Sequence, residues 1–165
     1  MGDYILRQAV EFIQRHPSER QELKFRLLPA VAYNGVFSEI NKEHLIVYSP
    51  ITALDFEHIS ENNLQKLKSR IQSNPYVFCT FVTPSGEGLK ALVLHDNQDP
   101  NYHKDMYNQL LIMFSEASQD PNCCDIARRN YFCYDPDIWV NNNVIPFHYT
   151  PTNNAGVHRH LLRML

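Results

Sequence analysis

The stretch that decides the fold is Ile51-Thr52-Ala53-Leu54-Asp55-Phe56-Glu57, in which two acids alternate with apolar residues. Side chains alternate between the two faces of a β-strand, so Asp55 and Glu57 would share one face while Leu54 and Phe56 bury the other. Two neighbouring carboxylates repel each other unless a cation or a proton lies between them. Hard divalent cations such as Mg²⁺ prefer carboxylate oxygens, so this pattern predicts a metal site on a strand. The alternative is a pair of exposed acids on a sheet face.

The segments around this strand predict an α/β (α+β) fold with a mixed or mainly antiparallel sheet flanked by helices. Helical spacing of apolar residues predicts helices over residues 3–15, between Ser60 and Asn74, and over residues 101–117. Runs of β-branched and aromatic residues predict strands over residues 25–37 (with a turn), 44–48, 51–57, 76–83, 89–95, 130–134 and 144–149. A turn at residues 84–88 should join two of these strands in a hairpin.

The chain has 165 residues and 44% hydrophobic composition, which is enough for one domain with a real core. We expect that domain over residues 1–149, followed by a tail over residues 150–165. A net charge of −3 weighs against a general nucleic-acid coat protein. No apolar run approaches the roughly 20 residues that span a bilayer, and the N-terminus has no signal-peptide pattern. We therefore expect no membrane partner and a cytoplasmic location.

The four cysteines are Cys79, Cys123, Cys124 and Cys133, and none forms a C-x-x-C pair. We interpret them as reduced thiols that pack as small apolar residues. A zinc site formed by Cys123, Cys124, Cys133 and a histidine is the alternative, although the ligand spacing is irregular.

A second motif is the glycine-containing turn Pro84-Ser85-Gly86-Glu87-Gly88-Leu89-Lys90. Glycine lets a phosphate approach the backbone amides, and Lys90 adds a positive charge at the start of the next strand. The alternative is a plain hairpin turn.

A third motif runs from Asp120 to Asn130, where acids and arginines precede a predicted strand. Asp120 could complete a metal site, and Arg128 or Arg129 could clamp a phosphate by a two-pronged contact. The alternative is a salt-bridged helix cap.

Taken in this order, the three motifs resemble those of the archaeo-eukaryotic primase superfamily, which includes primase–polymerases of mobile elements. More closely, residues 24–143 resemble the VirE-type amino-terminal domain family of mobile-element proteins. The matching segments are Leu28-Pro29-Ala30, Gly35-Val36-Phe37-Ser38, Leu54-Asp55-Phe56-Glu57, Pro84–Lys90, Asp120–Arg128, Tyr134-Asp135-Pro136 and Asn141.

The resemblance implies an RRM-like, primase–polymerase-like sheet and a role in mobile-element DNA replication. It implies Mg²⁺ or Mn²⁺ and transfer of nucleotides from a nucleoside triphosphate to a primer or initiating nucleotide on single-stranded or primed DNA. A helicase or another replication protein would be a further partner. The implied catalytic and metal-binding residues are Asp55, Glu57 and Asp120. The implied phosphate-binding residues are Ser85, Gly86, Gly88, Lys90 and Arg128.

The chain departs from the superfamily pattern at Lys90, where a histidine is usual. A lysine can hold a phosphate as a point charge but cannot act as a neutral imidazole. This departure motivates a second hypothesis, a catalytically inactive module that binds nucleic acid or a partner protein on the same fold. A third alternative is a rolling-circle nuclease, which His158-Arg159-His160 resembles superficially. Its middle residue should be apolar, so a basic tail is favoured there.

Overall fold

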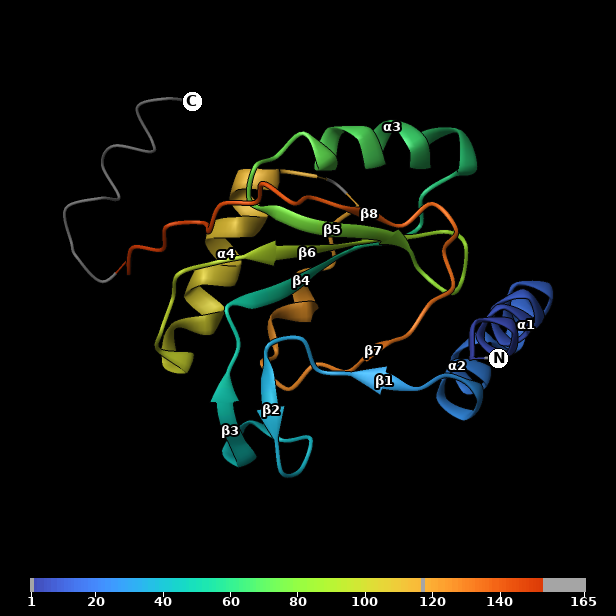
Figure 1. Cartoon of the computed structure of the whole chain (residues 1–165), viewed down its shortest axis with the longest axis horizontal. Coiled ribbons are helices and arrows are strands. Elements are labelled where there is room, and N and C mark those ends of the chain that lie inside the picture. The colour runs from blue at the N-terminus through green and yellow to red at the C-terminus, as the bar shows by residue number, and fades with distance from the viewer. Residues whose placement is uncertain (1, 117, 153–165) are drawn as a thin grey trace.

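The computed structural model describes residues 2–116 and 118–152 (Figure 1). Most of the expected tail, including His158-Arg159-His160, therefore lies outside the described residues. The expected α+β class is confirmed: helices flank a sheet in which every pair of neighbouring strands is antiparallel.

The central sheet has four strands in the order β4-β6-β5-β8. These strands are β4 (Ile51–Phe56), β5 (Val77–Val82), β6 (Leu89–Leu94) and β8 (Trp139–Val140). The predicted hairpin is confirmed as β5 and β6, but β6 also pairs with β4 along its whole length. The motif strand β4 therefore lies at one edge, directly beside the strand that begins at Leu89 and Lys90.

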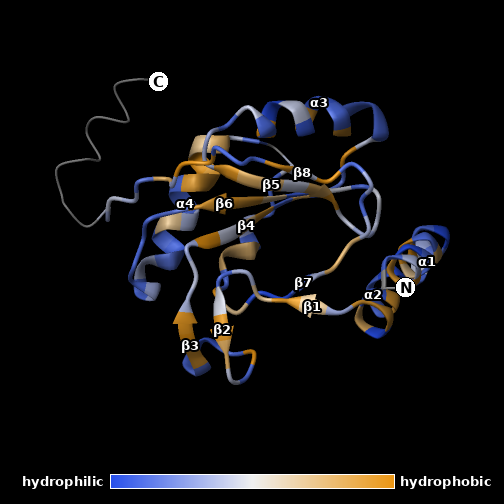
Figure 2. Cartoon of the chain, in the orientation of Figure 1, coloured by the Kyte–Doolittle hydropathy of each residue, from blue (hydrophilic) through white to orange (hydrophobic). Residues whose placement is uncertain are grey.

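Helices α3 (Glu61–Gln72) and α4 (His103–Phe114) supply the apolar side chains that pack on one face of this sheet. Leu54 and Phe56 of β4 are fully buried on that face, as the alternation of the strand predicts. In Figure 2 the strands of the sheet are mainly hydrophobic, whereas α3 carries many hydrophilic residues. The main core therefore lies between the sheet and these two helices.

The two N-terminal helices and the two small sheets lie away from that core (Figure 1). Helices α1 (Gly2–Arg15) and α2 (Arg20–Leu27) pack together beside the small sheet of β1 (Ala30–Val31) and β7 (Asn130–Tyr131). Strands β2 (Gly35–Phe37) and β3 (Leu45–Tyr48) form a separate antiparallel hairpin. Single 3-10 turns occupy Pro17–Glu19, Lys42–His44, Pro100–Tyr102 and Pro121–Cys124.

Two sequence expectations are wrong. Residues 25–27 belong to α2 rather than to a strand; this helix is mostly polar, so it shows little helical hydrophobic pattern. The expected strand over residues 144–149 is also wrong, and the last described strand is β8 instead. Pro146 has no backbone N–H to donate, and Phe147 makes only an isolated bridge to His95.

Candidate functional site

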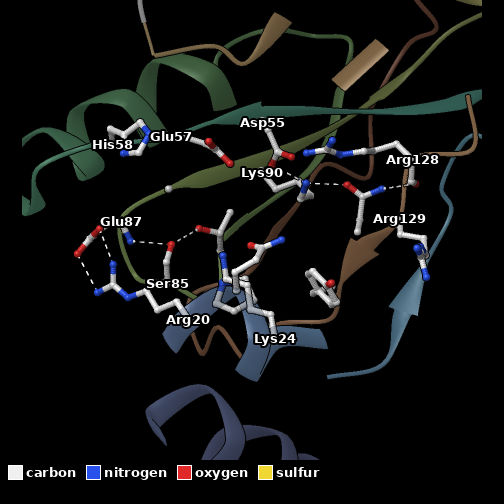
Figure 3. Close-up of a pocket in the computed structure, with 16 residues that line it drawn as sticks. Arg20, Lys24, Asp55, Glu57, His58, Ser85, Glu87, Lys90, Arg128 and Arg129 are labelled. Atoms are coloured by element: carbon white, nitrogen blue, oxygen red, sulfur yellow. Dashed lines mark hydrogen bonds and ion pairs between the residues drawn. The ribbon is translucent and has the colours of Figure 1, made fainter. Parts of the chain in front are cut away.

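A cavity of about 310 Å³ opens at the end of the β4–β6 pair (Figure 3). Four segments of the chain line it: α2, the end of β4, the turn between β5 and β6, and residues 128–131. Six of the eight site residues predicted from sequence lie in its wall: Asp55, Glu57, Ser85, Gly88, Lys90 and Arg128. The three motifs therefore meet in space although they are far apart in the chain.

Asp120 lies next to this cavity rather than in its wall. It lines an adjoining cavity together with Glu57 and His58, and its backbone N–H donates to the carbonyl of Asp55 at 3.0 Å. Glu57 and His58 line both cavities. The third predicted acid is thus close to the first two but faces a different opening.

The backbone geometry of the turn explains why glycine occupies positions 86 and 88. Gly86 has φ +78°, a left-handed conformation that other residues rarely adopt, and it faces Gln14 of α1 rather than the cavity. A side chain at Gly88 would meet the carbonyl oxygen of Phe56 at 2.8 Å. Gly88 therefore allows the turn to approach β4 closely, and the phosphate-binding role expected for Gly86 has no support in its position.

Asp55 and Lys90 are direct cross-strand partners in the register of β4 and β6, and their side chains form an ion pair. Both side chains are buried, with 9% and 6% of their surface exposed. The Lys90 ammonium also donates to Asn130 Oδ1 at 2.7 Å, and Asn130 in turn donates to the carbonyl of Arg128 at 3.1 Å. Two segments of the chain, β4 and residues 128–130, thus hold the lysine at the cavity floor.

Cys123 joins two of the predicted acids. Its thiol lies 3.4 Å from Asp55 Oδ2 and 3.2 Å from Asp120 Oδ2, so it can donate to either carboxylate. Burial raises the pKa of Cys123, and the charge of Asp55 raises it further, which keeps the thiol protonated. The sequence interpretation of Cys123 as a small apolar residue, or alternatively as a zinc ligand, does not include this contact, and its spacing of three from Asp120 is the signal that could have indicated it.

Asp120 caps the 3-10 turn that carries Cys123. Its Oδ1 accepts from the backbone N–H of Asn122 at 2.9 Å. Burial alone would raise the pKa of Asp120, but the hydrogen bonds from Asn122 and Cys123 outweigh it, and the charge of Arg128 adds to them. The pKa of Asp120 is therefore lowered, and its carboxylate is ionised at neutral pH.

Basic side chains outnumber acidic ones in the cavity wall. The basic ones are Arg20, Lys24, Lys90, Arg128 and Arg129, and the acidic ones are Asp55, Glu57 and Glu87. Glu87 is already paired: Arg20 donates to its two oxygens at 2.7 and 2.9 Å, which ties α2 to the glycine turn. The remaining charges leave the cavity with a surplus of cationic groups, an arrangement that attracts anions.

The surroundings shift the pKa values of Lys24 and Arg128 in opposite directions. Burial is the main reason why the pKa of Lys24 is lowered, and Glu57 only partly offsets it. Burial would also lower the pKa of Arg128, but nearby acidic groups, Asp55 and Asp120 among them, raise it overall. Arg128 thus remains a permanent cation that lines the cavity and lies 3.9 Å from Asp120 Oδ2.

Carboxylate oxygens suit Mg²⁺ or Mn²⁺, so the chemistry of Asp55, Glu57 and Asp120 fits such an ion. Their arrangement fits it less well, because Asp55 faces Lys90 and the Cys123 thiol. Within residues 2–116 and 118–152, no group of three or more His, Cys, Asp or Glu side chains is positioned to hold a metal. Lys90, the expected phosphate-binding residue, does not stand apart from the acids but contacts Asp55 directly.

The alternative zinc site does not form in the described part of the chain. Cys123 packs in the main core beneath the sheet, whereas Cys133 packs against two other clusters, one of which contains Val10 and Ile13. All four cysteines are free thiols, as expected.

The fold and the cavity define an α+β protein with a cationic pocket at the end of an antiparallel sheet. The chain belongs to the BT4734-like, N-terminal domain family, whose model matches residues 22–139. That match contains every residue of the cavity wall except Arg20 and Gln21. No curated protein and no solved structure matches the chain. None of the described helices has the length and apolar character needed to cross a membrane.

Proposed function

We propose that this chain is a primase–polymerase-like nucleotidyltransferase domain that acts in mobile-element DNA replication. The observation that carries the proposal is the shared cavity: Asp55 on β4 and Glu57 directly after it line the same space as cationic side chains from three other segments. Paired acids beside a cationic wall are what transfer of a nucleotide from a triphosphate needs. A cytoplasmic location and a helicase or other replication protein as partner belong to the same proposal.

In this proposal the cationic wall binds the triphosphate. Arg128 offers a planar, permanently charged group that can contact two phosphate oxygens, and Lys24 and Lys90 add point charges. Ser85 adds a hydroxyl at the turn, where it contacts Thr83 Oγ1 at 3.1 Å. These groups would orient the α-phosphate towards the 3′-hydroxyl of a primer or initiating nucleotide, and pyrophosphate would leave.

The proposal assigns Mg²⁺ or Mn²⁺ to Asp55, Glu57 and Asp120. As the described side chains lie, no such group of three is positioned to hold an ion, so these carboxylates would have to turn towards one another on binding. The ion would then supply positive charge for the transferred phosphoryl group. Cys123 would keep Asp55 and Asp120 at a fixed separation, since its thiol contacts both. The protein's own contribution is therefore positioning and charge complementarity.

The test is a nucleotide-incorporation assay with Mn²⁺, labelled nucleotides and either primed or bare single-stranded DNA. Wild type should extend the primer or form dinucleotides, and Glu57→Gln and Asp55→Asn should lower the rate at least about a hundredfold. Asp137→Asn is the matched control, because Asp137 is exposed and outside the cavity wall. Absence of both incorporation and metal-dependent nucleotide binding in wild type would end the proposal.

A second candidate function is a non-catalytic module that binds nucleic acid or a partner protein. The observation that favours it is the buried Asp55–Lys90 ion pair, which neutralises a predicted metal ligand within the protein itself. In that case DNA binding should be equal in wild type and Asp55→Asn, should need no metal, and should weaken when Arg128 is replaced by Ala.

A further inference from the structure

The ammonium of Lys90 lies where a cation would neutralise Asp55. One carboxylate oxygen of Asp55 pairs with Lys90, and the other contacts the Cys123 thiol. The pair is almost fully buried, so solvent screens these charges weakly. A divalent cation placed against Asp55 in this arrangement would be strongly repelled by the lysine.

The Lys90 ammonium can also move away from Asp55 into the cavity. It lines the cavity, and its charge is carried on a flexible four-carbon stem that can move without a change in the backbone. Lys24, Arg128 and Arg129 line the same space, so an anion that enters it meets a field of cationic groups. The ammonium has three donors and already contacts Asn130 Oδ1 at 2.7 Å as well as Asp55. A polyphosphate bound in the cavity would offer it further, negatively charged acceptors and so compete with Asp55 for it.

We propose that Lys90 is an internal counter-ion that keeps Asp55 closed to divalent cations until a polyphosphate in the cavity draws the ammonium away. This inference rests on the proposed function, since it describes how the same acids become available. It predicts that polyphosphate and metal bind cooperatively and that each raises the affinity of the other. The protein without nucleotide would therefore bind metal weakly.

The test measures Mn²⁺ affinity by electron paramagnetic resonance in the absence of nucleotide. Lys90→Gln removes the charge while its amide can still donate to Asp55, so it should bind Mn²⁺ at least about tenfold more tightly than wild type. Lys90→Arg keeps the charge and should bind like wild type. Asp55→Asn/Lys90→Gln should lose the gain, because the ligand is gone.

Lys24→Gln is the matched control. It removes one positive charge from the same cavity, and among the described residues Lys24 has no ion-pair partner. If the repulsion is local to Asp55, this variant should gain at most about threefold. Equal gains in Lys24→Gln and Lys90→Gln, or no gain in Lys90→Gln, would overturn the inference.

A second measurement on wild type does not depend on whether Lys90→Gln folds. The side-chain ammonium resonance of Lys90, assigned by its absence in Lys90→Arg, should shift when inorganic tripolyphosphate is added without metal. An unchanged Lys90 resonance while other resonances of the cavity wall saturate would contradict the inference. Nucleotide incorporation by wild type, assayed separately, decides the proposed function whichever way the Lys90 experiments turn out.

Discussion

The two ends of the paired strands β4 and β6 bury polar groups in opposite ways. At the cavity end, Asp55 and Lys90 are both charged and neutralise each other. At the other end, just beyond Leu94, His95 is 1% exposed, and neither of its ring nitrogens has a hydrogen-bond partner among the described residues. The cavity end thus buries two charged groups as an ion pair, whereas the other end buries a histidine that carries no charge.

The histidine end forms a small neutral cluster. Tyr48 OH lies 2.8 Å from His103 Nδ1 and accepts from Asn97 Nδ2 at 3.2 Å, so the hydroxyl bonds to both residues. Burial lowers the pKa of both His95 and His103 to about 4, and it raises that of Tyr48 to about 12. At the cavity end, pairing keeps Asp55 and Lys90 charged and available to a ligand. At the histidine end, burial without a counter-ion leaves His95 and His103 neutral.

The largest effect on stability should come from replacing one partner of the Asp55–Lys90 ion pair. Asp55→Asn or Lys90→Met alone leaves a buried charge without its partner and should lower the free energy of unfolding by about 3–5 kcal/mol. The double variant should lie within about 2 kcal/mol of wild type, because no charge remains buried. Urea denaturation at pH 7 gives all three values.

The exposed pair Arg26–Glu22 on α2 serves as a matched control for this cycle, since both side chains are 68% exposed. Its coupling energy should be below about 1 kcal/mol. If the coupling between Asp55 and Lys90 is as small as that, charge pairing does not stabilise the cavity end, and the contrast between the two ends disappears.

The next effect is a pH dependence that arises at the histidine end. The folded pKa of His95 is lowered to about 4 from an ordinary value of 6.5, so between these values the unfolded state binds a proton that the folded state does not. Stability should therefore be lost as pH falls from 6.5 to 4, by about 3 kcal/mol for His95. Above pH 6.5 this group should have no effect.

His95→Leu removes this titration and should roughly halve the slope of the stability profile over that interval, because His103, whose pKa is also lowered to about 4, still titrates there. It should not destabilise the protein at pH 7, because it also removes two buried nitrogens that lack partners. Thermal unfolding followed by circular dichroism from pH 7 to pH 4 checks both points. A variant profile as steep as that of wild type would place the acid sensitivity elsewhere.

Alternation along β4 and the apolar pattern of β5 and β6 were enough to predict the sheet and its antiparallel character. They also predicted that Leu54 and Phe56 are buried, because successive side chains of a strand point to opposite faces of the sheet. Helix α2 and strand β8 were not predicted. Helix α2 is mostly polar, and β8 has only two residues, so neither shows a periodic hydrophobic pattern.

Much of the candidate site could be predicted, because each motif carries its own local signal of acid, glycine or arginine. The contact between Asp55 and Lys90 could not, since it depends on the register of β4 against β6, which is a property of the whole sheet. The same holds for the Cys123 thiol, which reaches Asp55 from 68 residues away. Sequence patterns thus indicated which residues meet but not which charges neutralise each other.

The smallest effect compares two buried cysteines that lie on opposite faces of the sheet. Cys123 contacts the carboxylates of Asp55 and Asp120, whereas the described residues offer Cys79 no hydrogen-bond partner. A serine hydroxyl at position 123 would find these acceptors, so Cys123→Ser should cost less than about 1 kcal/mol of unfolding free energy. Cys79→Ser buries a hydroxyl without a partner and should cost about 1–3 kcal/mol. Urea denaturation of the two variants measures the difference, and a reversed order would show that Cys123 acts by apolar packing rather than as a donor to the acids of the cavity.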